Sequence, residues 1–337
     1  MTQADNLQSA NMEELKSLAP IVIFVYKRAD HTVNLLESLI ANDLADKSDV
    51  YIYSDGAKGE ADRGAVEEVR RLIHEAKWQQ AFKSLAIREA EVNKGLANSI
   101  IAGVTEIVNK YGRIIVLEDD LVLAPQFIRY MNQCLDAFTG DPRIFAVSGW
   151  TYPVPAFKKR YKKDAWLYYR ASSWGWGTWA DRWNRVEFDP VKADFAGKLA
   201  DPVWCEKFSR GGTDLPGMLK LQLEGKRDSW AIRWNAASVD LDMVTVYPTV
   251  SNVYNNGRDD SGTHCGALPY TQLGFAEGKE KYDFTGIELD ELVLRQAHTF
   301  DSETIGKKFK RNFRALLVDH KVPPVIRNLL AKIRKAG

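Results

Sequence analysis

The stretch Ile114-Ile115-Val116-Leu117-Glu118-Asp119-Asp120-Leu121-Val122-Leu123 decides the fold, because three consecutive carboxylates interrupt an otherwise apolar run. The four aliphatic residues before the acids predict a buried strand. Burying unpaired carboxylates is costly, so the acids are expected at the strand's end. Strand ends are where ligand sites form in α/β sheets, and hard divalent cations prefer carboxylate oxygens. The segment alone fits a metal-binding loop and an acidic turn equally well.

The residues before this stretch alternate between strand and helix patterns. Short β-rich runs lie at 21–26, 50–53 and 82–88, and helical patterns follow at 30–40, 62–78 and 96–110. This alternation predicts an α/β fold with a mostly parallel central sheet, helices on both faces and a ligand crevice at the strands' carboxyl ends. After residue 145, strands such as 144–148 and 166–169 are separated by Gly, Pro and aromatic loops. We expect this second half to continue the same sheet and to shape specificity.

Bulk composition narrows the class of protein. A chain of 337 residues exceeds the usual single core, which favours one large α/β domain with an appended piece or two domains sharing a cleft. The formal net charge of +1 gives no indication of a nucleic-acid partner. Cys134, Cys205 and Cys265 fit neither a disulfide framework nor a zinc knuckle, and no apolar run reaches membrane-spanning length. With no secretory signal pattern at the start, we expect a cytoplasmic protein.

Polar loops follow the first three predicted strands. Lys27-Arg28-Ala29-Asp30 follows the first strand, and Ser54-Asp55-Gly56-Ala57-Lys58 follows the second. Arg28 or Lys27 can neutralise a diphosphate, while Asp55 can accept hydrogen bonds from a ribose or a base. Lys94, in the turn that opens the helix after the third strand, is a further donor-binding candidate. Asp30 also suits a helix N-cap and Asp55-Gly56 a simple turn.

A second conspicuous stretch, 172–183, carries four tryptophans in ten positions with glycines between them. Aromatic faces stack on sugar rings, and glycines let a backbone approach a ligand closely. We therefore predict that Trp174, Trp176 and Trp179 bind sugar, the alternative being that they anchor the core or a loop.

Two further candidates lie beyond residue 225. Asp228 is followed closely by Trp230, and a carboxylate in aromatic surroundings suits a general base that takes a proton from a sugar hydroxyl. His264, in a Gly-rich loop, is a candidate metal or phosphate ligand, with an ordinary surface histidine as the alternative.

The tail is basic. Residues 306–337 contain ten Lys or Arg and a single acid, Asp319. Apolar residues recur there at helical spacing on both sides of Pro323-Pro324, which predicts two short basic amphipathic helices. Such helices bind anionic membrane surfaces, and they also occur as solvated tails packed on a domain.

Taken together, these residues resemble the nucleotide-sugar glycosyltransferases of the glycosyltransferase A fold, and more closely the N-acetylglucosaminyltransferase I group. Glu118-Asp119-Asp120 is similar to that group's Glu-Asp-Asp motif, and the segment 228–233 looks like its Asp-Asp-Trp-Met-Arg segment with only one of the two acids. Elements at 248–252 and 256–264 also resemble the family's. The resemblance covers roughly residues 20–266.

The resemblance implies roles for the acids and their neighbours. Asp120 is expected to coordinate Mn2+ or Mg2+, with Glu118 and Asp119 contacting the donor sugar and ribose. Arg28 is expected to contact the nucleotide, and Asp55 the uridine. The changes in pattern along the chain predict an arm (1–19), a donor-binding half (20–150), an acceptor and catalytic half of the same domain (151–270) and a C-terminal extension (271–337).

The function implied is an inverting, metal-dependent transfer from a nucleoside diphosphate sugar, most simply a UDP-sugar, to a saccharide or lipid-linked saccharide of a surface polysaccharide. If the tail binds a membrane rather than packing on the domain, such an enzyme is expected at the inner face of the plasma membrane. A nucleotidyltransferase is disfavoured because the loop 27–30 lacks glycine. A non-catalytic sugar-binding protein of the same fold explains the aromatics but not the acids. The absence of Gly-x-Gly-x-x-Gly and Walker-type loops argues against a dinucleotide enzyme or a P-loop NTPase.

Overall fold

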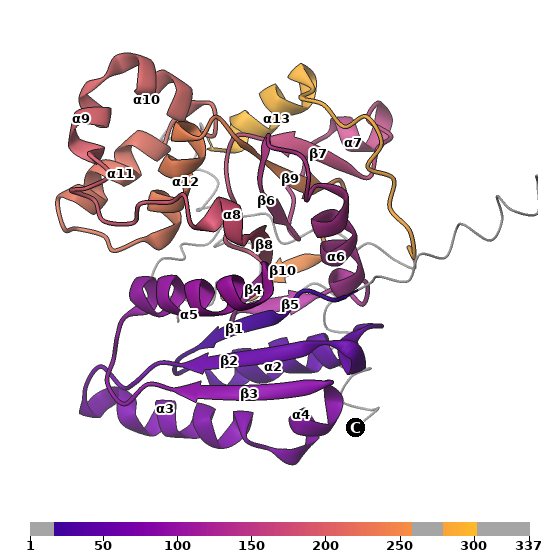
Figure 1. The fold of residues 1–337 in the computed structure, drawn as a ribbon, viewed down its shortest axis with the longest axis vertical. Coiled ribbons are helices and arrows are strands. Elements are labelled where there is room, and N and C mark those ends of the chain that lie inside the picture. The colour runs from indigo at the N-terminus through magenta and orange to yellow at the C-terminus, as the bar shows by residue number, and fades with distance from the viewer. Residues whose placement is uncertain (1–16, 258–278, 302–337) are drawn as a thin grey trace, which may run out of the picture.

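The computed structural model describes residues 17–257 and 279–301, which build an eight-stranded sheet flanked by helices (Figure 1). The strand order is β3-β2-β1-β4-β8-β6-β9-β7. The strands are β1 (Ile21–Val25), β2 (Asp49–Ser54), β3 (Ser84–Glu89), β4 (Arg113–Glu118), β6 (Ile144–Ser148), β7 (Ala165–Tyr168), β8 (Trp176–Trp179) and β9 (Val244–Pro248). A separate two-stranded antiparallel sheet joins β5 (Leu121–Leu123) to β10 (Val253–Asn255).

The first four strands run parallel and are covered on both faces. The helices among them are α2 (Ala29–Ile40), η2 (Ala45–Lys47), α3 (Glu60–Ile73), α4 (Ala76–Ala81) and α5 (Leu96–Tyr111). Successive strand residues point to opposite faces. Accordingly, Val50 and Ile52 of β2 pack with α2, α3 and α4, whereas Tyr51 packs with α5. Gly112 ends α5 in the left-handed conformation, φ +80°, which favours glycine.

The second half extends this sheet rather than starting a new one. Strand β8 lies antiparallel between β4 and β6, with Arg113 opposite Trp179 and Val147 opposite Gly177. β9 runs parallel to β6, and β7 closes the edge antiparallel to β9. The remaining helices are α6 (Phe127–Ala137), α7 (Ala156–Lys159), α8 (Ala180–Trp183), α9 (Phe195–Ala200), α10 (Pro202–Ser209), α11 (Leu215–Leu223), α12 (Trp230–Asp240) and α13 (Glu291–Asp301). The predicted α/β class, with a mixed and mostly parallel sheet between helices, is confirmed.

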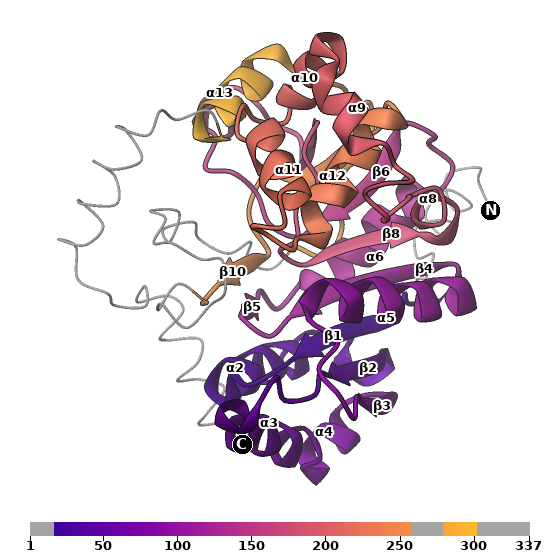
Figure 2. The same ribbon diagram turned by 90° about the vertical axis from the view of Figure 1, so that its left-hand side faces the viewer.

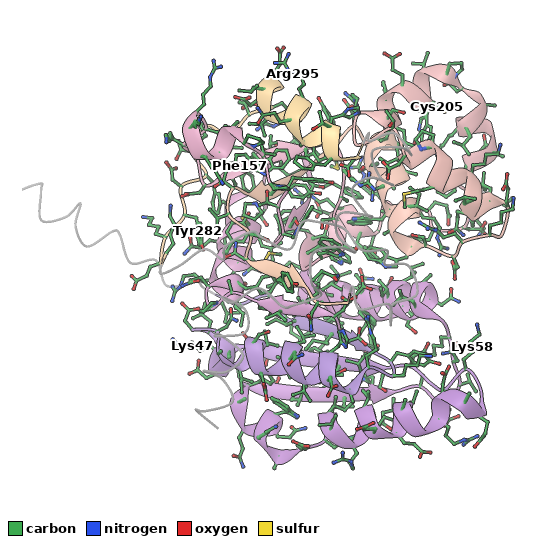
Figure 3. All side chains as sticks on the ribbon, turned by 180° about the vertical axis from the view of Figure 1, so that it is seen from behind. Lys47, Lys58, Phe157, Cys205, Tyr282 and Arg295 are labelled. Carbon is green, nitrogen blue, oxygen red and sulfur yellow. The ribbon has the colours of Figure 1, made fainter. Side chains whose placement is uncertain are left out.

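Helices α9 to α12 form a group with an apolar centre of its own. Phe195, Phe208, Leu219 and Ile232 are buried together there. The group stands on the side of the molecule toward which β1 and β2 point, as Figures 1 and 2 show. Lys47, before β2, and Lys58, after it, lie on opposite sides in Figure 3, with α10's Cys205 on the Lys58 side. Helices therefore stand over the edge where the predicted site residues gather.

Some expectations concern parts of the chain that are not described. His264, Cys265 and the basic residues 306–337 lie outside the described residues. Within residues 17–257 and 279–301, no helix is both long and apolar enough to cross a bilayer.

Candidate donor site at the carboxyl ends of the strands

The acidic triplet lies where β4 ends. Glu118 is the last residue of β4, and Asp119 and Asp120 form the turn to β5. Asp119 and Asp120 are buried, with 5% and 9% of their surfaces exposed. A charged carboxylate loses its hydration when it is buried, which costs free energy unless a cation or hydrogen-bond donors compensate. The strand end predicted from the sequence is therefore where the acids are found, and the structure brings Arg28 to them.

Arg28 pairs with the two aspartates of the triplet. It precedes α2 directly, and its guanidinium forms ion pairs with Asp119 and with Asp120, the latter at 3.1 Å between Nη2 and Oδ2. Burial lowers the pKa of Arg28, but the two carboxylates outweigh burial and raise it above its ordinary value. Its second terminal nitrogen, Nη1, is buried and has no hydrogen-bond partner among the described residues. The two N–H groups of this nitrogen therefore lack a hydrogen-bond acceptor within the described residues.

The three acids repel one another in this space. Burial, and then the charges of Asp120 and Asp119, raise the pKa of Glu118 to about 8, against a smaller opposing effect of Arg28. Burial also raises the pKa of Asp119, although Arg28 and His31 oppose that rise. With its pKa of about 8, Glu118 is mostly protonated at pH 7, and the one arginine still faces two aspartates, so the cluster keeps an excess of negative charge that a cation would relieve.

The chain leaving β10 crosses directly over the acidic turn. The backbone N–H of Asn256 donates to the Asp120 carbonyl at 2.7 Å. A Cβ atom on Gly257 would lie 2.4 Å from Asp120 Oδ2 and 2.9 Å from Arg28 Nη1, so only glycine fits here. On the other side of this crossing, the His31 imidazole contacts the Asn256 carbonyl. Figure 2 shows β10 and β5 above α2.

Asp55 has a structural role that the sequence did not reveal. One carboxylate oxygen accepts hydrogen bonds from the N–H groups of Gly56 and Lys94, and the other from Gly95 N–H and the Asn93 amide, all at 2.9–3.1 Å. The side chain thereby fastens the loop before α5 to the end of β2. A direct contact to uridine, as expected from the resemblance, would have to share oxygens that already accept four hydrogen bonds.

A cavity of about 350 Å³ lies beside this loop. The residues that line this cavity include Asp55 and Lys94, two of the predicted donor-binding residues, and also Tyr53 and Arg88. Burial and a hydrogen bond to Glu106 raise the pKa of the Tyr53 hydroxyl, so it remains a neutral donor group. A larger hollow of about 690 Å³, lined by residues that include Phe138 and Tyr282, lies on the side opposite Lys58 (Figure 3).

Part of the tryptophan stretch, Trp176–Trp179, forms β8, and the two tryptophans on it are buried, which corrects the prediction that they bind sugar. Trp176 and Trp179 on β8 are 1% and 4% exposed. Trp176 stacks on Trp183 and Trp230. The Arg182 guanidinium lies over the Trp179 ring, 4.6 Å from its centroid. Because both rings are enclosed by protein, neither can stack on a sugar.

Trp174 differs from its neighbours. It is partly exposed and meets Trp150 edge-on, 4.8 Å between ring centroids. The adjacent Gly175, with φ +61°, packs against Val253 of β10, the strand whose end crosses Asp120. The position of Trp174 therefore suits the predicted contact with a sugar.

Asp228 is not enclosed by aromatic rings. Its side chain is 64% exposed and forms an ion pair with Arg233 at 3.0 Å, while Trp230 turns into the core. It lies just before α12, whose first turn is capped by Ser229. An acceptor can reach the carboxylate, but the apolar surroundings expected from the sequence are absent.

The residues present fit a metal ion bound jointly with a diphosphate. Among the described residues no three His, Cys, Asp or Glu side chains are grouped to hold a metal. Mg2+ at nucleotide sites, however, usually takes only one or two carboxylates from the protein and the rest from phosphates and water, and Mn2+ favours the same oxygen ligands. Asp120, with Asp119 beside it and the Arg28 guanidinium paired with both, matches that donor set.

Comparison with known proteins establishes the family. The model of the GNT-I family matches residues 2–193, more than half of the chain, and the protein belongs to this family. The resemblance to the N-acetylglucosaminyltransferase I group is thus confirmed. The alpha-1,3-mannosyl-glycoprotein 2-beta-N-acetylglucosaminyltransferase of Arabidopsis thaliana is 26% identical over 145 residues, which cover 38% of this chain and 32% of the plant protein. The match therefore spans about a third of that relative.

Solved structures with a similar arrangement are more distant. The mannosyltransferase PcManGT from Pyrobaculum calidifontis, in complex with GDP-Man and Mn2+, is 12% identical with a TM-score of 0.41, over 98% of this chain and 76% of that chain. S. aureus TarS 1–349 is 11% identical with the same TM-score of 0.41, over 72% of this chain and 61% of that chain.

Proposed function

We propose that this protein is an inverting, divalent-metal-dependent glycosyltransferase that moves a sugar from a nucleoside diphosphate sugar, most simply a UDP-sugar, to a hydroxyl of a saccharide or lipid-linked saccharide acceptor. The observation that carries the proposal is the Arg28–Asp119–Asp120 cluster at the end of β4. It combines an excess of buried negative charge with an unpaired guanidinium N–H, which suits a cation and a diphosphate together. Membership of the GNT-I family supports the same reaction class.

In the mechanism we propose, Asp120 would hold Mn2+ or Mg2+, and Glu118 and Asp119 contact the donor sugar and ribose. A bound metal would supply positive charge for the departing diphosphate. Arg28 donates its Nη1 N–H to a phosphate oxygen and keeps the aspartates in place. His264 remains a predicted further ligand outside the described residues.

Asp228 accepts the proton of the acceptor hydroxyl. As that proton leaves, the hydroxyl oxygen bonds to the anomeric carbon, and the bond from this carbon to the phosphate oxygen breaks with its electron pair. The products are the glycosylated acceptor and the nucleoside diphosphate. No covalent intermediate on the protein is needed, so its main contributions are positioning and charge stabilisation.

The metal site is tested by Asp120→Ala. We expect Mn2+-dependent binding of UDP, measured by calorimetry, to weaken at least about 100-fold, because the carboxylate that joins metal and protein is lost. Asp46→Ala, an exposed carboxylate on η2, serves as the matched control and should bind as the wild type does. Full turnover of the Asp120→Ala enzyme in the presence of EDTA would contradict the assignment.

The base is tested by Asp228→Asn. Turnover of a UDP-sugar panel should fall by about 10²- to 10⁴-fold while UDP binding is retained, because proton transfer and donor binding use different residues. A variant with unchanged turnover would place the base elsewhere. Carbohydrate binding without any nucleotide binding by the wild type would instead favour a sugar-binding protein.

The setting we propose is surface polysaccharide or glycolipid synthesis at the inner face of the plasma membrane. The charge of residues 306–337 supports attachment to anionic lipid, since each basic residue near such a surface adds about 1 kcal/mol. Deletion of 306–337 is expected to reduce co-sedimentation with anionic vesicles. Equal sedimentation of the two proteins would refute attachment through the tail.

A further inference from the structure

The segment Asn256–Gly257 is held against the acidic turn from two sides. On one side, Asn256 N–H donates to the Asp120 carbonyl at 2.7 Å, and the Gly257 backbone packs against the Asp120 carboxylate. On the other side, His31 Nε2 lies 3.2 Å from the Asn256 carbonyl oxygen. A carbonyl oxygen only accepts hydrogen bonds, so Nε2 must carry the proton and donate it.

His31 and Arg28 lie together at the start of α2. Arg28 is the residue before the helix, and His31 is in its first turn. The Thr32 N–H and hydroxyl both donate to the Arg28 carbonyl at 2.9 Å, which fixes this turn. His31 is 9% exposed, so its hydrogen bond is largely shielded from water. One helical turn therefore binds the acidic side chains through Arg28 and the crossing segment through His31.

We infer that His31 is a positioning residue for the donor site: its Nε2–H holds the Asn256–Gly257 backbone over Asp120 and so fixes the carboxylate that receives the metal. Asp120 is fastened on three sides, by Arg28 at its carboxylate, by Asn256 at its carbonyl and by Gly257 at its side chain. Of these three attachments, those made by Asn256 and Gly257 are the ones that the His31 hydrogen bond supports. Loss of this hydrogen bond removes one of the contacts that hold the segment, while the bond from Asn256 N–H to the Asp120 carbonyl and the Arg28 ion pairs remain.

The inference rests on the proposed function, and its test compares two replacements of the same histidine. The His31→Gln side chain places an amide N–H near the position of Nε2 and keeps the donor, whereas His31→Leu fills similar space without one. Groups that orient a metal ligand typically contribute 10- to 100-fold to metal affinity. We expect His31→Leu to weaken Mn2+ binding, followed by electron paramagnetic resonance, by about 10-fold or more, and His31→Gln to remain within about 3-fold of the wild type.

The remaining variants separate positioning from folding. His31→Asn, whose amide is too short to reach the carbonyl, should resemble His31→Leu and replaces it if the leucine variant does not fold. His74→Leu, an exposed histidine at the end of α3, is the matched control. Gly257→Ala moves the same segment by steric contact, so its effect and that of His31→Leu should be less than additive.

Each outcome decides a different question. Equal Mn2+ and UDP affinities for the wild type, His31→Leu and His31→Asn would overturn the positioning role alone. Equal losses in His31→Gln and His31→Leu would also overturn it, because the retained donor would then have no effect. A wild-type protein that binds neither Mn2+ nor UDP would overturn the proposed function together with this inference.

Discussion

At the residue scale, the acidic triplet carries more negative charge than the neighbouring Arg28 neutralises. Three carboxylates lie beside one guanidinium, and Glu118 ends an apolar strand. The sequence predicted the strand end and the acids, because an apolar run followed by three carboxylates is a local pattern. It did not predict that Arg28 would pair with them, since that contact joins residues 91 positions apart.

The pKa of Glu118 leads to a prediction on stability. In the unliganded protein its pKa of about 8 lies above the ordinary value of 4.5, so the folded state binds the proton more tightly than the unfolded state does. Stability contributed by this group is therefore lost as pH rises from about 4.5 to about 8. Glu118→Gln removes that loss, and urea unfolding at pH 8.5 should show the variant more stable by roughly 2–4 kcal/mol.

The comparison at low pH completes this test. Near pH 4.5 the two proteins should differ much less, because the wild-type carboxyl group is then protonated in the folded state. Asp46→Asn, on the surface, should leave the pH profile unchanged. A stability difference independent of pH would contradict the raised pKa.

At the element scale, the loops that end the strands are shaped by side chains that the sequence suggests as ligands. Asp55 is the plainest case, with four hydrogen bonds from the loop 93–95 and from Gly56. A motif tells which residue type occupies a strand end, but it does not tell whether its oxygens face a ligand or the protein's own N–H groups. Asp55 therefore links β2 to α5.

Asp55→Asn tests this link. The amide cannot accept on both sides, so one set of N–H groups loses its partner, and we expect a loss of about 1–3 kcal/mol in the free energy of unfolding. UDP affinity should fall as well, because Lys94 moves with the loop. The matched control is Asp189→Asn, because Asp189 also accepts hydrogen bonds from two loop N–H groups, those of Val191 and Lys192. The control variant should leave UDP affinity unchanged. Unchanged stability of Asp55→Asn would contradict the link.

The residue pattern of the stretch 172–183 was not enough to predict β8 or the burial of its tryptophans. The glycines between the tryptophans were expected to let the backbone approach a ligand, yet Gly177 is required because a Cβ there would lie 2.8 Å from the Ile114 carbonyl on the neighbouring strand. Trp176 and Trp179 then fall on opposite faces of the sheet and enter different apolar clusters. Long-range pairing, which has no local signal, decides their burial.

Two substitutions separate the tryptophans. Trp176→Ala should cost about 3–5 kcal/mol of stability, because it empties a site stacked between Trp183 and Trp230. Trp174→Ala should cost far less and instead raise the KM for a sugar substrate. Urea unfolding and steady-state kinetics measure the two effects, and equal losses of stability would contradict the distinction.

At the scale of the whole molecule, the sequence predicted the parallel half, and in the second half it predicted the strands at 144–148 and 166–169 and the continuation of the sheet, but not β8 or the helices α9 to α11. Alternating strands and helices up to residue 118 follow local periodicity, and the four predicted strands are present. The insertion of β8 between β4 and β6 joins distant segments, and the short helices α9 to α11 interrupt any clear period. The surroundings of Asp228, though not its proposed role, were mispredicted for the same reason, since they depend on how α12 packs.

The position of β8 also limits how this molecule can move. Its antiparallel pairing with β4, from Arg113 to Val116, continues into the pairing with β6, so backbone hydrogen bonds run across the middle of the molecule. A hinge between the first and second halves would have to break them. The sheet therefore holds the two halves as one body, so the acidic turn after β4 and the end of β10 keep a fixed position relative to each other.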